Sequence, residues 1–382
     1  MAEIPELLLL EDIEALSEAY RREFGQPPIN LSTWDPSFQL LDGLEPKPPA
    51  MRSDGWIDYS FSYDLDERAE LIAKFGFDQK LFGGLATHSG STAIISVINW
   101  LRAIRCKRIL IIAPRYFSVP HALNVFDIEY DLLHVRRTPA GYVLPDIKDV
   151  TAANCDAVWI THPVYCTSVD FNGSVLNTIR ALVHRHKLIC VVDECLSEPG
   201  RYISASLAES GPVTAIFAPH KAVCINGLKF GFVAFPAEHQ RHFDAWSDVW
   251  NGCLPASSVL AVRHFLSPDF ERYRGDFKSK IANSHALLRS IVGKFPNLSL
   301  DSGADGYLVS VFVPRLSHDL GTNLPFLRDA TWSSGASFIA GARNELDPAS
   351  GLSFRVNLSN LDQGAAGALA RLCDWLNTRE DD

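Results

Sequence analysis

The sequence predicts an α/β protein with an open sheet in a large domain and a second, smaller domain. Its 382 residues exceed what one hydrophobic core usually serves. Between about residues 88 and 235, helical periodicity alternates with short apolar runs rich in Val and Ile. Each run ends at a polar or Gly-rich turn, and open α/β sheets bind ligands at such strand ends. A binding site is therefore expected along one edge of the sheet.

The domain boundaries follow from the order of these patterns. An irregular, Pro-containing segment (residues 1–50) is expected to pack with the small domain, and the large domain is expected over 51–270. The small domain is expected over 271–382, with apolar runs at 307–313 and 353–358 and a final helix over 363–378. The expected strands of the large domain are Arg108–Ala113, Ala157–Thr161, Leu188–Asp193, Val213–Ala218 and Phe230–Phe235.

Composition narrows the class of protein. Hydrophobic residues make up 47% and charged residues 21%, which is typical of a compact globular chain and not of a membrane or disordered one. The net charge is −10 and no Lys/Arg run is dense, which argues against nucleic acid. The apolar run Leu7–Leu10 is too short for a targeting segment, and the residues that flank it are acidic. We therefore expect a cytoplasmic protein that makes no membrane contact and whose partner is a small molecule.

Cysteine and histidine spacings give no metal signal. The eight cysteines include no Cys-x-x-Cys pair, and they are expected to be buried thiols in a reducing compartment. His184 and His186 lie at the end of a predicted helix, where a cation favours the helix dipole and a surface role is more common than a ligand role. No metal site is predicted.

Three candidate binding motifs lie between residues 87 and 193. The turn Thr87–Ala93 opens a helical stretch, and its amides and hydroxyls could bind an anion, although such a Ser/Thr-rich start also caps ordinary helices. Tyr116 follows a strand and could lie flat on an aromatic ligand or belong to the core. Asp193 ends a buried strand, where an acid could face a protonated ring nitrogen, bind a metal or cap a helix.

Three cations complete the set. Lys221 follows a buried strand, and a partly buried lysine beside other cations suits Schiff-base chemistry. Lys229, eight residues later in a Gly-x-Lys-x-Gly run, could be a second cation for a phosphate. Arg355 lies in an apolar strand, where a buried guanidinium usually pairs with a carboxylate.

The order and spacing of these motifs, from about residue 30 to 360, resemble the class I/II aminotransferases, which are pyridoxal 5′-phosphate (PLP) enzymes of fold type I. The resemblance implies a mostly parallel seven-stranded sheet plus a smaller C-terminal α/β domain. It implies a Schiff base on Lys221, an Asp193 contact to the ring nitrogen, and a Tyr116 stack on the ring. The implied phosphate cradle is Ser89, Gly90, Ser91 and Thr92.

The resemblance also implies contacts to substrate and to a second chain. Arg355 would take the substrate α-carboxylate. Such families place the site between the subunits of a homodimer, and Tyr59 resembles the tyrosine that the partner chain lends to the phosphate.

The sequence departs from the family at four positions around the site. Tyr165 stands where the family has a cofactor-binding asparagine, and Leu196 stands where it has a tyrosine, so Tyr165 is expected to donate to the same cofactor oxygen from the opposite side. Lys229 stands where the family has an arginine, and a lysine amine cannot form the two parallel hydrogen bonds that a guanidinium makes to a phosphate. Trp34 replaces a small residue and could roof the substrate pocket, or be a displaced core residue.

His220 precedes Lys221, and this pair resembles the His-Lys pair of fold-type-I decarboxylases. In those enzymes the resemblance would imply a role for His220 at the cofactor phosphate or ring. The Gly-x-Lys-x-Gly spacing favours the aminotransferase branch.

The expected function is an aminotransferase-like reaction in specialised biosynthesis. An amino substrate would displace Lys221 from its aldimine, and the freed amine would remove the α-proton while Asp193 keeps the ring protonated. Elimination or replacement at the β or γ carbon, C–C bond formation and decarboxylation remain alternatives. A non-catalytic cofactor-binding protein is least favoured, because both Lys221 and Asp193 are present.

Overall fold

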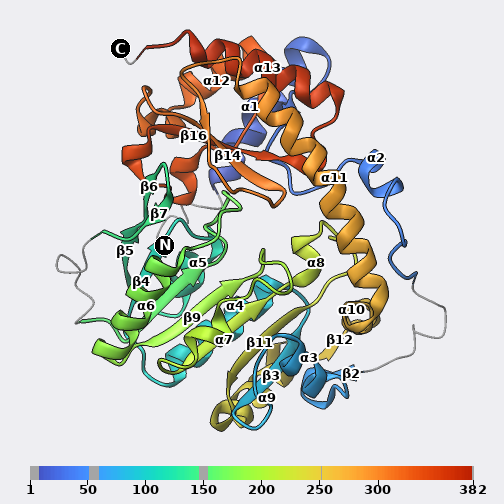
Figure 1. Ribbon diagram of the computed structural model, residues 1–382, viewed down its shortest axis with the longest axis vertical. Helices are drawn as coiled ribbons and strands as arrows, with labels where there is room; N and C mark the ends of the chain where they lie inside the picture. Colours follow the sequence, from blue (N-terminus) through green and yellow to red (C-terminus); the bar gives the residue numbers. More distant parts are fainter. Residues whose placement is uncertain (1–7, 51–59, 146–153, 251, 381–382) are drawn as a thin grey trace.

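The computed structural model describes residues 8–50, 60–145, 154–250 and 252–380. Seven strands form the central sheet in the order β3-β11-β10-β9-β8-β4-β5 (Figure 1). Strand β11 is antiparallel to both of its neighbours, and the remaining strands run parallel to one another. The α/β fold and the mostly parallel seven-stranded sheet are therefore confirmed. The strands are β3 (Phe82–Thr87), β4 (Arg108–Ala113), β5 (Glu129–His134), β8 (Ala157–Thr161), β9 (Ile189–Glu194), β10 (Val213–Phe217) and β11 (Gly231–Pro236).

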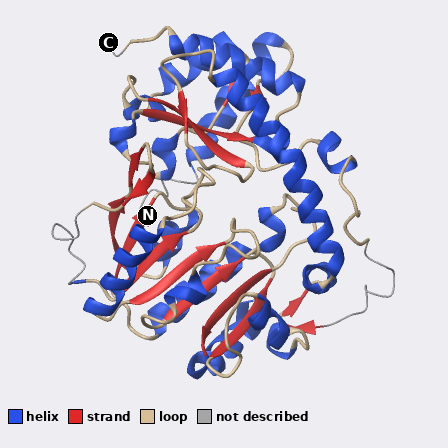
Figure 2. Ribbon diagram, viewed as in Figure 1, coloured by secondary structure: helices blue, strands red, loops and turns tan. Residues whose placement is uncertain are grey.

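Helices cover both faces of this sheet (Figure 2). The side chains of β8 alternate: Ala157 and Trp159 join one buried cluster, and Val158 and Ile160 join the other. The first cluster includes α4 (Gly90–Ala103), α5 (Ser118–Val125) and part of α9 (Gln240–Trp250), and the second includes α6 (Gly173–His186) and α7 (Ser204–Leu207). Burial on both faces explains why these strands read as continuous apolar runs.

The C-terminal part forms a smaller α/β unit above the sheet (Figure 1). Its antiparallel sheet has the order β13-β14-β16, and α11 connects it to the large domain. Helix α11 crosses the boundary expected at residue 270. The N-terminal α1 contacts α12, and β1 pairs with β15. The bounds are α1 (Leu8–Phe24), β1 (Ile29–Asn30), α11 (Pro268–Val292), β13 (Ser299–Leu300), β14 (Leu308–Val313), α12 (Leu324–Ser334), β15 (Ala336–Ser337), β16 (Leu352–Asn357) and α13 (Gln363–Asn377).

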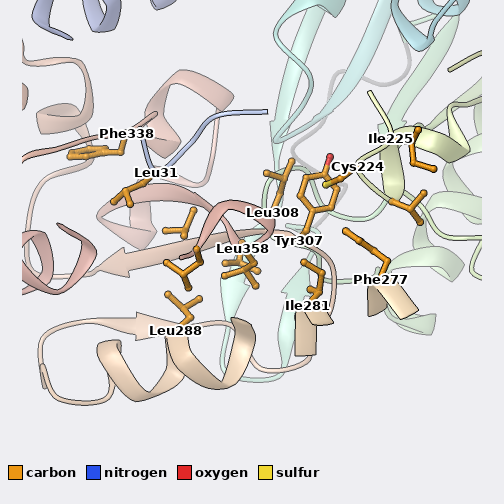
Figure 3. Packing of buried hydrophobic residues seen from close by; sticks show 14 of the residues in the cluster. Leu31, Cys224, Ile225, Phe277, Ile281, Leu288, Tyr307, Leu308, Phe338 and Leu358 are labelled. Carbon is orange, nitrogen blue, oxygen red and sulfur yellow. The ribbon is translucent and has the colours of Figure 1, made fainter. Parts of the chain in front are cut away.

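One hydrophobic cluster joins the two units. It runs from Leu31 through Phe277 on α11 to Leu308 on β14, and it reaches Ile225 beside the candidate site (Figure 3). The remaining elements are α2 (Phe38–Asp42), β2 (Ser60–Phe61), α3 (Arg68–Lys74), β6 (Arg136–Thr138), β7 (Gly141–Val143), α8 (Pro219–Ala222), β12 (Cys253–Leu254) and α10 (Ala256–Leu266). No helix within the described ranges is both long and apolar enough to cross a bilayer. All eight cysteines are free thiols.

Candidate functional site

A cavity of about 320 Å³ lies where the parallel strands end. Its wall brings together residues from six separate segments of the chain. Of the residues predicted from the sequence, it contains Trp34, Ser89, Gly90, Ser91, Tyr116, Tyr165, Asp193, Lys221 and Lys229. Residues separated by almost 200 positions in the sequence therefore converge on one space.

Lys221 enters this cavity from the short helix α8, directly after β10. Its Nζ atom lies 4.6 Å from the ring centroid of Tyr116 and 4.4 Å from that of Trp34. Both distances are within the range of a cation–π contact. The amine is thus held against two aromatic faces, one of which is the ring expected to stack on a planar cofactor.

Asp193 is 2% exposed and lies near the end of β9. The backbone N–H of Cys195 donates to its Oδ1 atom at 3.1 Å. Burial raises the pKa of the Asp193 carboxyl, against the opposing effect of the bonds from Cys195 and the charge of Lys221. Within the described ranges Asp193 has no direct ion pair, so a protonated pyridine nitrogen would supply a closer countercharge than Lys221 does.

The N-terminus of α4 lines the cavity with Ser89, Gly90 and Ser91. Ser89 is the N-cap: its hydroxyl accepts the backbone N–H of Thr92 at 3.3 Å and lies 3.1 Å from the Thr92 hydroxyl. The Cβ atom of any other residue at Gly90 would come within 2.7 Å of the Cys195 sulfur. At Gly231 it would lie 2.3 Å from the Ser89 carbonyl oxygen. Both glycines are therefore needed to pack the backbone this closely around the helix start.

Tyr165 contributes a buried phenol. It is 2% exposed, and within the described ranges its hydroxyl bonds no nitrogen or oxygen atom and has only the weakly bonding Cys166 thiol beside it. Burial raises its pKa well above the ordinary value, so the group stays protonated and can donate. The Tyr165 ring packs edge-on against Tyr116, 5.9 Å between centroids. A cofactor oxygen beside Tyr116 would satisfy this otherwise costly buried hydroxyl.

The loop that carries Tyr165 is held by the small domain. The Ser168 hydroxyl donates to the Leu308 carbonyl at 2.6 Å, and the Ser310 hydroxyl donates to the Cys166 carbonyl at 2.9 Å. Cys166 (φ 62°) and Ser168 (φ 55°) both adopt the left-handed region, which is uncommon for residues with a side chain. These contacts fix an unfavourable backbone that directs Tyr165 into the cavity.

Three predicted site residues lie outside the cavity wall, and a fourth is not described. His220 is fully buried, with its Nε2 atom 3.0 Å from Nδ1 of His264 and its ring among phenylalanines, so it does not line the cavity. The Thr92 hydroxyl is engaged with Ser89 and is not part of the cavity wall. Arg355 contacts Trp34 and is likewise outside that wall. Tyr59 lies outside the described residues.

Sequence reasoning missed three residues at the site. Thr161 ends β8 in the cavity, and its buried hydroxyl has no partner within the described ranges. Asn226 lines the cavity and donates from Nδ2 to the Trp34 carbonyl at 2.9 Å. Tyr307, directly before β14, donates its phenolic hydrogen to the carbonyl of Lys221 at 3.0 Å. Thr161 and Asn226 lie at expected strand ends and turns, but nothing in the sequence connects Tyr307 to Lys221.

Tyr307 is expected to position Lys221. Its hydroxyl points toward the segment that carries Cys224, just beyond α8 (Figure 3). Replacing Tyr307 with phenylalanine removes one buried hydrogen bond, worth about 1 kcal/mol, and should lower kcat by up to about tenfold with little change in KM. The matched control is Tyr273→Phe, which deletes a buried phenol that has no partner within the described ranges. Equal losses of kcat in both variants would contradict a positioning role.

The geometry fits PLP, on observations of this chain alone. A buried carboxylate without a direct ion pair, a buried phenol, an aromatic face and a glycine-lined helix start lie around the Lys221 amine. These groups would suit the ring nitrogen, the phenolic oxygen, the ring face, the phosphate and the aldehyde carbon of that cofactor, respectively.

Solved structures share this fold. The chain resembles an alanine aminotransferase from Pyrococcus furiosus (TM-score 0.76, 14% identity, 96% of each chain covered). It also resembles an aminotransferase from Mycobacterium tuberculosis (TM-score 0.75, 15% identity, 99% of this chain and 98% of that chain covered). A third similar structure is a methionine aminotransferase from Escherichia coli (TM-score 0.74, 15% identity, 95% of this chain and 97% of that chain covered). No protein-family model and no curated protein matches the sequence. The chain therefore has the fold-type-I aminotransferase fold in a divergent sequence.

Proposed function

We propose that this chain, which has the fold of fold-type-I aminotransferases, is a PLP-dependent aminotransferase-like enzyme that acts on an amino acid. The observation that carries the proposal is the convergence of Lys221, Asp193, Tyr116 and the start of α4 on one cavity. Lys221 would hold the cofactor covalently through Nζ. Asp193 would accept the ring N–H, and the Ser89–Ser91 turn with Lys229 would hold the phosphate.

The residues of this site have separable roles. Bound PLP would supply an electron sink that stabilises negative charge on the substrate α-carbon. The Nζ atom of Lys221, once released, would take the α-proton and could return it to a neighbouring carbon. The carboxylate of Asp193 would keep a proton on the ring nitrogen, because a buried anion favours the adjacent cation. Tyr165 would donate to the phenolic oxygen, and Tyr116 would fix the plane of the ring.

The test is an amino-transfer half-reaction. Protein loaded with PLP is mixed with each standard amino acid, and the cofactor is analysed by mass spectrometry. Formation of pyridoxamine 5′-phosphate and the matching oxo acid is expected for at least one substrate. A product that has lost carbon dioxide or a β or γ substituent, with no pyridoxamine 5′-phosphate, would contradict amino transfer and favour a lyase.

The proposal extends to a specialised biosynthetic role and a homodimer. Trp34, Tyr165 and Lys229 line the cavity, and each departs from the residue that the aminotransferase resemblance implies. Changes concentrated around the cofactor favour an unusual substrate over central metabolism. Sedimentation of the loaded protein tests the dimer: a monomer that carries out full turnover would contradict a site shared between two chains.

A further inference from the structure

The side chain of Trp34 stands between the cavity and the most buried cation near it. Arg355 is 2% exposed and does not line the cavity, whereas Trp34 is half-buried and does. The centroid of the Trp34 ring lies 4.5 Å from the Arg355 guanidinium carbon and 4.4 Å from Lys221 Nζ. One indole ring thus contacts both the cation proposed for the substrate carboxylate and the amine proposed for the cofactor.

Arg355 lacks an anionic partner. Its Nη2 atom donates to the Ser32 carbonyl, and its Nη1 atom lies 3.8 Å from the Cys166 sulfur. Its Nε atom has no hydrogen bond, and no carboxylate pairs with it, among the residues that the structure describes. A buried guanidinium without an anion is costly, and the Trp34 indole compensates it in part through a cation–π contact.

The backbone around Trp34 is fixed, so the ring can leave only by turning. Nδ2 of Asn226 donates a hydrogen bond to the Trp34 carbonyl at 2.9 Å, and Nδ2 of Asn357 donates one to the Thr33 carbonyl at 2.9 Å. The hydroxyl of Ser32 is bonded on both sides, to the Arg355 carbonyl and to the N–H of Ile339. Because these bonds hold the backbone of residues 32–34, the half-buried Trp34 ring can move only by rotation about its side-chain torsions.

We propose that the Trp34 indole is a shutter over Arg355, and that a substrate carboxylate opens it by displacing the ring. A bidentate carboxylate–guanidinium pair is stronger than the cation–π contact that it replaces. Substrates are then restricted to amino acids, because a simple amine has no group that could displace the indole. This inference rests on the proposed function and on the expectation from the sequence that Arg355 takes the substrate carboxylate.

The test uses PLP-loaded protein and acetate, the simplest carboxylate, with chloride at equal ionic strength as the control. The protein is labelled with 5-fluorotryptophan, and the Trp34 resonance is assigned by its loss in Trp34→Phe. Acetate should shift the Trp34 resonance saturably, and chloride should not. The shift should be weakened in Arg355→Lys and absent in Arg355→Met.

A calorimetric titration gives the second measurement. If the indole covers Arg355 in about ten molecules for every one in which it is turned away, Trp34→Ala should bind acetate about tenfold more tightly than wild type. Unchanged affinity in Trp34→Ala, or acetate binding without movement of the Trp34 resonance, would overturn the shutter. The cofactor absorbance of each sample separates the two claims: protein that never retains PLP refutes the proposed function, whereas loaded protein with a static Trp34 refutes the shutter alone.

Discussion

Lys221→Ala is expected to lower turnover by about 10⁴-fold, the largest effect of any single substitution in this chain. The variant loses the amine that would hold the cofactor and also the group that would move the α-proton, and general-base catalysis alone contributes up to about 10⁴. No other lysine within the described ranges has its amine against both Tyr116 and Trp34. Single-turnover kinetics with a substrate from the amino acid panel provides the measurement.

The matched control for Lys221→Ala is Lys229→Ala, the same change at the other lysine of the cavity. Lys229 is exposed and would contribute charge to the phosphate, so its loss should weaken cofactor binding. Saturating PLP should restore the activity of Lys229→Ala and leave Lys221→Ala inactive. Equal rescue of the two variants would contradict the assignment of Lys221.

Asp193→Asn is expected to lower turnover by roughly 10³-fold, the second largest effect. A carboxylate about 4 Å from a pyridinium stabilises it by about 4 kcal/mol at an effective dielectric of about 20, which corresponds to roughly three powers of ten in rate. The amide keeps the shape of the side chain and removes this charge. The ring nitrogen then loses its proton at neutral pH, and the electron sink weakens.

Glu194→Gln is the control for this charge. Glu194 is adjacent and buried, but it faces away from the cavity and bonds to the N–H of Ile203 at 2.6 Å. Burial raises the pKa of Glu194 to about 8, so the group is mostly protonated at neutral pH and glutamine resembles it closely. Glu194→Gln should retain turnover within a few-fold. A comparable loss in both variants would indicate a general disturbance of β9 and not a role for the Asp193 charge.

Most of the fold could be predicted from local patterns. Two strands of the central sheet, β3 and β5, were not predicted, and each lacks a clear strand pattern for a physical reason. Strand β3 contains Gly83 and Gly84, which weaken a strand pattern. A Cβ atom at Gly84 would lie 2.4 Å from the Phe232 ring, so the glycine makes room for a large neighbour on β11. Strand β5 is a half-exposed edge strand with Glu129 and Asp131, and it lacks the apolar run of its neighbours.

The site could be predicted where function depends on residues at strand ends, and not where it depends on tertiary contacts. Asp193 lies near the end of one buried strand and Lys221 follows the neighbouring one, so the topology alone brings them together. The burial of His220 against His264, 44 residues away, has no local signal. The same holds for Tyr307, whose bond to Lys221 spans 86 positions. The sequence left Trp34 either as a roof of the pocket or as a core residue, and its contact with Arg355 depends on the packing of the small domain.

The most direct test of the central claim is borohydride reduction of the purified, PLP-loaded protein, followed by peptide mass spectrometry. One modified peptide is expected, carrying the reduced cofactor on the Nζ atom of Lys221, and no modification is expected in Lys221→Ala. Attachment to a different lysine, or a wild-type protein that binds PLP without any borohydride-fixed adduct, would contradict the central claim.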